Sequence, residues 1–600
     1  MIDFNALTDE EAKRRLEEND FRIGTLFRAL DKDGDGRLSP EEIDAAPEVL
    51  RAMAKNGSGS LTENELGGPT TIPGVIRRSG IVRMLDFDGD LVVTAEDIAD
   101  APNRIRMLDR DGDGYVTADD DIPKSGDIEA SMPMGTPSQV FQLQHMMNYR
   151  EPEDFGPLLP RGQAGLQDGY TLIQECCVRS DVQKANGLYL IDNMGRRVHK
   201  WHMAYNAPEA ISAYLLENGN IVRASCKELP EVAELMFPVG INGTLTIEDA
   251  DSNILWEFTH FEEEFEALHH DFEVLPNGNI LAICWANCTP EKARTFGWRD
   301  GSQKSRIVFD KLYELKPNLE TGETEIVWEW DVRDHIVQDM DAEGANYGSV
   351  ADTPNKIDIN FAKPDEIQFN EGQLIHLNAI SYNPDLDLIL LSSPIFGEVW
   401  VIDHSTTTQE ARTGAGGRYG KGGDLLFRWG NPAAYQSGTA EDQVLFWQHD
   451  VQWLLSDVPN HGGHILVYNN GGRRGADGKP DPNEVCQGVV TGAYTDVLEV
   501  KLPFDKDGGI NSTGEATVQW GFNQDGSKGV YSPFMSSAQR LPNGNLSVLQ
   551  GYNKRILEAT DAGEIILDYY MGGPGRIFKI RKYPPDYPGI QKLAHRFKKS

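Results

Sequence analysis

The chain has 600 residues, which is enough for about four domains of average size, or for fewer if one of them is a large all-β domain. Hydrophobic residues make up 39% of the chain and charged residues 25%, a composition that is typical of folded proteins and excludes general disorder. Acidic residues outnumber basic ones by 94 to 56. The resulting net charge of −38 disfavours nucleic acids and anionic membranes as partners and favours cations.

No segment approaches the roughly 18 consecutive apolar residues that cross a bilayer. The first residues lack the basic and apolar regions of a secretion signal, so we expect a cytoplasmic protein by default. Six cysteines in 600 residues are too few for a disulfide scaffold. The sequence also has no CxxC pair, which disfavours a structural zinc site.

The first predicted element is a calcium-binding loop at residues 31–42. Carboxylates stand at its first, third and fifth positions, a glycine at its sixth provides the sharp turn, and a glutamate at its twelfth can bind in bidentate fashion. Calcium is a hard cation that takes roughly six to eight oxygen ligands, and this spacing supplies them. The predicted ligands are Asp31, Asp33, Asp35, the backbone carbonyl of Arg37, and Glu42.

Three further loop frames follow, at residues 54–65, 86–97 and 109–120. The first of these has alanine in place of its first ligand, so we expect it to bind weakly or not at all. Frame 86–97 has Leu91 where the turn glycine is expected, and the last two frames end in aspartate, which favours weaker calcium binding or more magnesium character. The predicted ligands in the last two frames are Asp86, Asp88, Asp90, Asp97, Asp109, Asp111, Asp113, the backbone carbonyl of Tyr115, and Asp120.

The spacing of the loops suggests two pairs of helix-loop-helix units. Loop starts 31 and 54 are 23 residues apart, and so are loop starts 86 and 109. We expect a short β-bridge to couple the two loops within each pair. Residues 20–125 resemble the calmodulin-like EF-hand family, which implies an N-terminal all-α EF-hand domain over residues 1–125. The bound metal could regulate the protein or could only hold this domain folded, and the sequence leaves both roles open.

Residues 126–164 are rich in proline, glycine and methionine and are predicted to be a linker. Residues 165–600 contain short β segments with turn signals, among which Asn-Gly-Asn recurs at 218–220, 277–279 and 543–545 as a tight hairpin. A second pattern, two apolar strands that end in an aromatic residue, occurs six times. Six copies of a four-stranded unit predict an all-β six-bladed β-propeller. The copies are Leu188–Trp201, Thr244–Trp256, Leu312–Trp330, Val399–Trp429, Val497–Trp520 and Ile556–Tyr570.

Three of the 13 histidines occupy matching places at the first strand of three different units: His270, His376 and His449. The innermost strands of a propeller surround its central channel, so this register predicts that the three imidazoles meet at one mouth of the channel. A cluster of titratable groups in such a place is a candidate active site. Three histidines could alternatively hold zinc or another transition metal.

Four segments resemble the bacterial arylsulfotransferase (aryl-sulfate sulfotransferase) family: His269–Asn279, His376–Asn383, Val399–His404 and Gln448–Asp450. The resemblance spans about residues 165–580. It implies a six-bladed propeller that transfers a sulfuryl group from a small aromatic sulfate ester to a phenol, through a transiently sulfated histidine and without a nucleotide. It also implies His449 as the nucleophile, with His270 and His376 as acid and base. His269 and Asn378 would contact the sulfate, and Arg418 could supply positive charge.

Two other functions stay open. The family has an arginine in the segment that corresponds to 392–395, where this chain has Pro394, and proline offers neither charge nor a donor. The propeller could therefore be another histidine-dependent enzyme, such as a lyase, hydrolase or isomerase, with or without a metal. It could also be a calcium-responsive binding module without catalysis, because the fold does not dictate the function.

Overall fold

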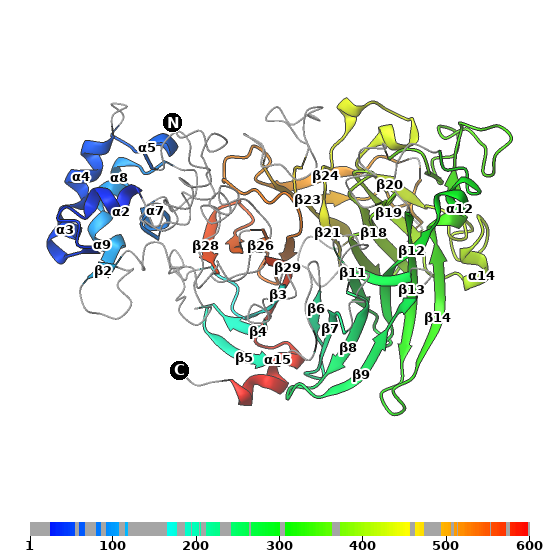
Figure 1. The fold of residues 1–600 in the computed structure, drawn as a ribbon, viewed down its shortest axis with the longest axis horizontal. Coiled ribbons are helices and arrows are strands. Elements are labelled where there is room, and N and C mark those ends of the chain that lie inside the picture. The colour runs from blue at the N-terminus through cyan, green and yellow to red at the C-terminus, as the bar shows by residue number, and fades with distance from the viewer. Residues whose placement is uncertain are drawn as a thin grey trace, which may run out of the picture. The chain divides into compact units, whose positions relative to one another are not determined.

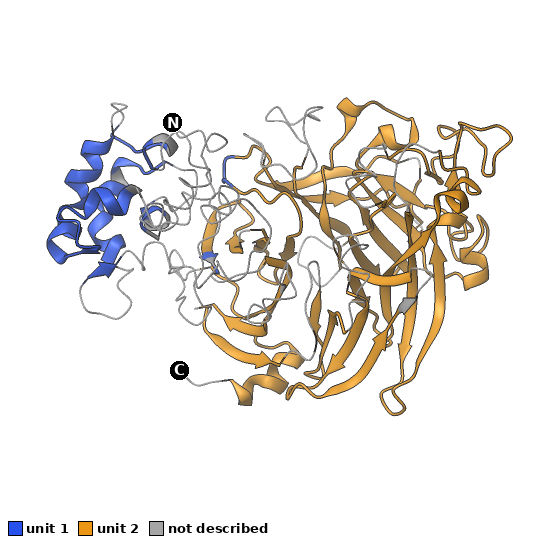
Figure 2. Ribbon diagram, in the orientation of Figure 1, with its two compact units in different colours: residues 1–159, 527–529, 569–574 blue, residues 160–526, 530–568, 575–600 orange. Residues whose placement is uncertain are grey.

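The computed structural model divides into two compact units (Figure 2): residues 1–159 with 527–529 and 569–574, and the remainder of the chain. The predicted linker, 126–164, lies outside the described residues. None of the described helices is long and apolar enough to cross a membrane. The structure describes residues 25–54, 59–66, 80–85, 92–106, 115–117, 165–176, 187–193, 195–202, 205, 212–227, 240, 242–262, 266–299, 306–362, 372–455, 463–472, 494–505, 509–512, 514–552, 554–571 and 576–597.

The first unit consists, in its described part, of short helices of four to eight residues and two short β contacts. The described residues therefore do not show the all-α domain that was expected. Their apolar side chains form one core, which includes the residue at the eighth position of each of the four loop frames: Leu38, Leu61, Val93 and Val116. The elements are α2 (Thr25–Leu30), β1 (Arg37–Leu38), α3 (Pro40–Asp44), α4 (Ala46–Met53), α5 (Glu63–Leu66), α7 (Gly80–Leu85), α8 (Ala95–Ala99), α9 (Ala101–Arg106) and β2 (Val116–Thr117).

The β contacts join other frames than predicted. Strand β1 of the first frame pairs with β2 of the fourth, and Leu61 of the second frame pairs with Val93 of the third through two 2.9 Å hydrogen bonds. The predicted coupling of consecutive loops is wrong for these contacts, because each described bridge joins loops from different halves of the unit. The bridging residues Leu38, Leu61, Val93 and Val116 all belong to one core, so packing in that core and not order in the chain selects the partners.

The second unit is a six-bladed β-propeller (Figure 1), as predicted. The blades are six antiparallel sheets whose strands follow one another from the inside outward. They are β29-β3-β4-β5 (Arg576–Tyr583, Tyr170–Cys176, Gly187–Asp192, Arg197–Trp201), β6-β7-β8-β9 (Ala213–Leu215, Ile221–Ser225, Thr244–Glu248, Ile254–Thr259), β11-β12-β13-β14 (Glu266–Val274, Ile280–Cys288, Ile307–Pro317, Thr324–Asp331) with the short β10 (Phe261–Glu262) beside β11, β17-β18-β19-β20 (Ala379–Asn383, Leu388–Ser393, Glu398–Asp403, Phe427–Trp429), β21-β22-β23-β24 (His449–Leu454, His464–Asn469, Asp496–Lys501, Thr517–Phe522) and β25-β26-β27-β28 (Ser537–Arg540, Leu546–Gln550, Arg555–Ala559, Ile565–Tyr570).

Short helices and strands lie in the connections between the blade strands. The segment between blades 3 and 4 contains a parallel pair of two-residue strands, and short helices lie in connections and near the C-terminus. These elements are β15 (Ile336–Val337), β16 (Ile357–Asp358), α12 (Pro290–Arg294), α14 (Thr408–Ala411), α15 (Pro588–Leu593), and the 3₁₀ turns η5 (Val332–Asp334), η6 (Pro432–Tyr435), η7 (Ala440–Asp442) and η8 (Ala594–Arg596).

Both sequence patterns correspond to fixed places in the blades. Each of the six strand pairs ending in an aromatic residue is the outer hairpin of one blade, such as β4-β5 and β23-β24. The Asn-Gly-Asn segments are the turns between the two inner strands of blades 2, 3 and 6. Their glycines, Gly219, Gly278 and Gly544, have φ angles of +88°, +85° and +89°, a region that residues with a Cβ seldom adopt.

The first blade is built from both ends of the propeller sequence. Its innermost strand, β29, comes from the C-terminal end and pairs with β3 from the N-terminal end, which Figure 1 shows side by side. This pairing closes the ring of blades without a free sheet edge between the two ends.

Buried charges on the innermost strands connect three blades. Lys579 Nζ on β29 lies 2.5 Å from Asp271 on β11 and 2.9 Å from Asp450 on β21, and the Arg581 guanidinium lies 2.7 Å from Asp450. Asp271 also accepts hydrogen bonds from Ser212 Oγ and the Tyr214 hydroxyl in blade 2. We call these charged side chains, Asp271, Asp450, Lys579 and Arg581, the axial ion network, because they tie alternate blades together at the propeller axis.

Replacing Asp450 by asparagine is expected to destabilise the propeller by about 3–5 kcal/mol, since Arg581 would stay buried without its carboxylate and Lys579 would keep only Asp271. Burial raises the pKa of Asp450, but Arg581 and Lys579 outweigh this and hold the pKa below its ordinary value. The carboxylate therefore stabilises the fold above pH ~4 and loses this effect as the pH falls below its folded-state pKa. Urea unfolding of Asp450→Asn and of the exposed control Asp352→Asn measures the difference, and equal midpoints would contradict the role of the network.

Candidate functional site

The three candidate histidines lie at the inner strands of three blades, and residues with left-handed backbone angles occur at or beside each of them. His270 lies in a bulge of β11 with φ +53°, and His376 precedes β17 with φ +57°. His449 begins β21 between Trp447 and Asp450, whose φ angles are +56° and +46°. Non-glycine residues rarely adopt this conformation, and such strain tends to persist where the surrounding structure fixes it, often at functional sites.

The structure brings the rings of these three histidines together. The His270 and His376 ring centroids are 4.7 Å apart in an edge-to-face arrangement. His270 and His449 both contact the ring of Phe578 from blade 1, at 5.9 and 6.2 Å. We call His269, His270, His376 and His449 the histidine cluster. All four imidazoles are buried, with 8% exposure or less.

His449 has a defined tautomer. The Asn470 amide nitrogen donates to the carbonyls of Ser532 and Met535, so its Oδ1 must be the acceptor that faces His449 Nδ1 at 2.8 Å. Nδ1 therefore carries the proton, and the Nδ1 nitrogen also lies 3.0 Å from the Trp447 carbonyl oxygen. Nε2 keeps its lone pair and accepts the Met535 N–H at 3.2 Å.

Burial keeps the histidine cluster neutral. It lowers the pKa of His449 to about 4, although hydrogen bonds to Asn470 and the Trp447 carbonyl oppose the shift. Burial lowers the pKa of His376 to about 3 and those of His269 and His270 well below the ordinary value, and the proximity of other histidines adds to the shift for His270 and His376. Neutral imidazoles can act as nucleophiles and bases.

His269 connects the cluster to a buried carboxyl that the sequence analysis did not single out. His269 Nδ1 lies 2.8 Å from His270 Nδ1, and His269 Nε2 lies 2.8 Å from Asp310 Oδ1 on β13. The His269 ring stacks on Trp285 at 4.5 Å. No sequence signal links Asp310 to the histidines, because it stands 40 residues further along the chain in an ordinary apolar strand.

The axial ion network was also missed, although its signals are visible in retrospect. Asp271 and Asp450 each follow a cluster histidine directly, and Lys579 directly follows Phe578 on β29. The Lys579 charge lies near enough to His449 to lower its pKa. A cation is thus present beside the cluster, contributed by blade 1.

Asn378 belongs to this region and Arg418 does not. The Asn378 amide nitrogen donates to the Gln448 carbonyl at 2.8 Å, while its buried Oδ1 has no partner among the described residues. The Arg418 guanidinium instead lies against the carbonyls of Asp385 and Leu386, in the turn after β17. Asn378 and this turn stand at opposite ends of β17, about 20 Å apart at 3.3 Å per residue. Arg418 therefore does not supply charge to the cluster.

In the first unit, the carboxylate oxygens of Asp31, Asp33 and Asp35 come within 4.8 Å of one another, close enough to share an ion. Glu42 closes the loop: one carboxylate oxygen accepts the Lys32 N–H, and the other caps α3 through the N–H and hydroxyl of Ser39. Burial raises the pKa of Glu42, but these hydrogen bonds outweigh it and lower the pKa. Carboxylate and carbonyl oxygens of this kind are the ligands that calcium prefers.

The other predicted metal ligands are only partly covered by the structure. Tyr115 of the fourth frame lies beside Arg37 of the first, with the guanidinium 5.9 Å from the ring centre, in line with the β1-β2 pairing. The Asp97 carboxylate bonds to Thr94 and pairs with Arg104 at 2.8 Å. The predicted ligands outside the described residues are Asp86, Asp88, Asp90, Asp109, Asp111, Asp113 and Asp120.

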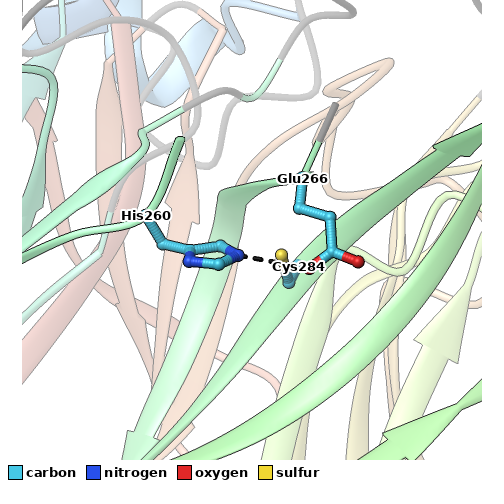
Figure 3. Close-up of side chains that lie close together, drawn as sticks. All are labelled: His260, Glu266 and Cys284. Atoms are coloured by element: carbon cyan, nitrogen blue, oxygen red, sulfur yellow. Dashed lines mark hydrogen bonds and ion pairs between the residues drawn. The ribbon is translucent and has the colours of Figure 1, made fainter. Parts of the chain in front are cut away.

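A second group of ligand-type side chains lies in blade 3, where His260, Glu266 and Cys284 point toward one another (Figure 3). Both oxygens of Glu266 are already in use. One lies 2.7 Å from Lys311 Nζ, and the other accepts the Tyr313 hydroxyl at 2.5 Å and lies 3.2 Å from His260 Nε2. The group is therefore a satisfied ion-pair network. Within the described residues, His270, His376 and His449 do not form such a group, which disfavours a three-histidine metal site.

Comparison with known proteins gives one family and a set of distant folds. No curated protein matches the chain. A protein of unknown function from Bacteroides caccae is 12% identical over 70% of this chain and 99% of its own, with a TM-score of 0.34. A periplasmic gluconolactonase from Pseudomonas aeruginosa is 9% identical over 69% of this chain and 99% of its own, also with a TM-score of 0.34. The profile of the arylsulfotransferase (ASST) family matches residues 179–567. Since this match covers well over half of the chain and nearly all of the propeller, the protein belongs to the arylsulfotransferase family.

Proposed function

We propose that the propeller is a nucleotide-independent aryl-sulfate sulfotransferase in which His449 carries the sulfuryl group. Family membership supports a sulfotransferase-like function. The observation that carries the finer proposal is the convergence of neutral, buried histidines from blades 3, 4 and 5: His270 contacts His376, and both His270 and His449 contact Phe578. A small phenolic sulfate ester is the donor, and a second phenol is the acceptor.

The tautomer of His449 suits it to nucleophilic attack. In the first half-reaction, the Nε2 lone pair forms a bond to sulfur, and the bond from sulfur to the phenolic oxygen breaks with its electron pair. The departing phenolate takes a proton from the acid. The positive charge that develops on the imidazole is stabilised at Nδ1–H by Asn470 and the Trp447 carbonyl. The Met535 N–H must leave the lone pair of Nε2 for this step.

The second half-reaction reverses the first with a new phenol. The acceptor oxygen bonds to sulfur and gives its proton to the base, while the electron pair of the nitrogen–sulfur bond returns to Nε2. The neutral ring of His270 or His376 serves as the base that takes the proton of the acceptor phenol. It becomes an imidazolium and then serves as the acid for the next departing phenolate. The charge on the sulfuryl oxygens would be stabilised by positioned donors and by the nearby positive charge of Lys579.

We further propose that the first unit binds calcium as an EF-hand-like domain, with magnesium possible in frames 86–97 and 109–120. The grouped carboxylates of Asp31, Asp33 and Asp35 support the first site. The β contacts of β1 with β2, and of Leu61 with Val93, support cooperation between loops of different halves. Calcium bound in this way contributes to folding of the unit.

His449→Ala is expected to abolish sulfuryl transfer from p-nitrophenyl sulfate to phenol, since no other group would form the intermediate. His202→Ala, at an exposed histidine, is the matched control and should keep wild-type turnover. Release of p-nitrophenol measures the rate, and mass spectrometry of rapidly quenched protein should find the sulfuryl group on His449. Full activity of His449→Ala would exclude the assigned nucleophile.

The rate of histidine sulfation is expected to stay constant on acidification until the pH approaches about 4. Burial lowers the pKa of His449 to about 4, so the lone pair of Nε2 stays available above that pH and is lost to a proton below it. Single-turnover release of p-nitrophenol, quenched into alkali, gives this profile. An inflection near the ordinary value of 6.5 would show that His449 is not buried in the working enzyme.

Glu42→Gln is expected to weaken calcium binding at the first loop by about tenfold or more, because the last position supplies two oxygens and a negative charge. Calorimetric titration of the metal-free protein with calcium chloride measures the affinity. Glu48→Gln, which changes an exposed glutamate of α4 outside the loop, is the control. Equal affinities of the two variants would argue against the loop as a calcium site.

A further inference from the structure

His404 lies in the joint between blades 3 and 4, and both blades supply partners for its imidazole. Nδ1 is 2.7 Å from Asp387 Oδ1, in the turn between β17 and β18 of blade 4, and Nε2 is 3.1 Å from Glu314 Oε2 on β13 of blade 3. The ring also meets Tyr382 of blade 4 and Trp328 of blade 3 edge-on, with 5.2 and 5.1 Å between ring centres. Each blade thus contributes one carboxylate and one aromatic ring.

The two carboxylates determine how this imidazole is protonated. A carboxylate only accepts hydrogen bonds, so both ring nitrogens of His404 must donate. A neutral imidazole has one N–H and would turn its lone pair toward the second carboxylate. Imidazolium is the form that satisfies both contacts, and it is largely buried, with 12% of the side chain exposed.

We propose that His404 is a pH-sensitive clamp: as imidazolium it holds blades 3 and 4 together at neutral pH, and its deprotonation at alkaline pH loosens this joint. The clamp goes beyond the proposed sulfotransferase function and does not rest on it. It joins the two blades that carry His270 and His376, so it supports the part of the propeller from which these two cluster rings meet.

The groups of blade 4 that face His404 suit a cation near neutral pH. The hydrogen bond from His404 lowers the pKa of Asp387, and burial opposes this shift. The Tyr382 hydroxyl, which donates to Asp387 at 2.8 Å, and the charge of Arg418 add to the lowering. Burial and the contact with Asp387 raise the pKa of Tyr382, so its hydroxyl stays a donor. The backbone N–H of His404 donates to the Asp387 carbonyl at 3.1 Å, which anchors the histidine in its own blade.

On the side of blade 3, Glu314 is the ionised partner. Burial raises the pKa of Glu314, but hydrogen bonds from His404 and Asn279 outweigh it and lower the pKa. Burial lowers the pKa of His404 itself, but Asp387 and Glu314 outweigh it and raise the pKa to about 9. This value lies above the ordinary 6.5, so the clamp stabilises the propeller in full below pH ~6.5 and is lost as the pH rises through about 9.

Two other joints between blades use cations that do not titrate in this range. Arg540 of blade 6 lies 3.2 Å from Glu499 of blade 5, and Lys554 of blade 6 lies 3.0 Å from Glu175 of blade 1. Arginine and lysine keep their charge to about pH 10 or higher. Of these three joints, the one at His404 therefore weakens first as the pH rises.

Thermal unfolding of wild type and His404→Gln between pH 6 and pH 10 tests the clamp. All 11 tryptophans lie between residues 201 and 520, so their fluorescence reports the propeller. Glutamine is polar but does not titrate. We expect its melting temperature to lie about 3 °C or more below wild type at pH 6, and to equal wild type at pH 10. His202→Gln, at an exposed histidine, should follow the wild type throughout. A constant difference between His404→Gln and wild type from pH 6 to pH 10 would overturn the clamp.

Nitrogen NMR of protein labelled with ¹⁵N at its histidines measures the charge directly. In the wild type, His404 should be protonated at both nitrogens at pH 8 and should titrate near pH 9. Asp387→Asn, which removes one carboxylate, should lower the pH at which this signal titrates, while Asp385→Asn in the same turn should not. If no histidine is protonated at both nitrogens at pH 8, or if Asp387→Asn leaves the titration unchanged, the clamp is excluded whether or not His404→Gln folds.

Discussion

The contact of Lys579 with Asp271 and Asp450 is the interaction on which the arrangement of the propeller centre depends. These charges come from three alternate blades and are buried, so each loses its solvation and needs the others. Both aspartates directly follow cluster histidines. The network therefore holds the backbone next to His270 and His449. Because Phe578 directly precedes Lys579, it also holds the Phe578 ring in contact with both histidines.

The left-handed residues of the inner strands follow from the same constraint. In a regular strand, neighbouring side chains point to opposite faces. Here a histidine must face the cluster while the next residue, an aspartate, reaches the axial ion network in the interior. A positive φ at His270 and at Asp450, with a break in the strand register at both places, makes room for both directions. The chemistry of the site is thus linked to a local departure from ideal strand geometry.

Burial gives the histidine cluster its chemical character. Desolvation removes the charged form of each imidazole, so hydrogen bonds decide which nitrogen is protonated. Asn470 settles this for His449, because its two donor positions are taken by backbone carbonyls.

The sequence by itself determined the propeller, because strand pairs and Asn-Gly-Asn turns are local patterns whose sixfold repetition has few other solutions. It also determined which histidines share a register, and the carboxylate spacing of the first loop. Only the tertiary structure decided the rest. Asp310 and Lys579 reach the cluster through contacts between residues far apart in the chain. The loops of the first unit pair across its two halves, where their apolar eighth-position residues share one core. Such contacts depend on which elements are neighbours in the folded chain. Neighbours of this kind are not marked by any periodic pattern in the sequence.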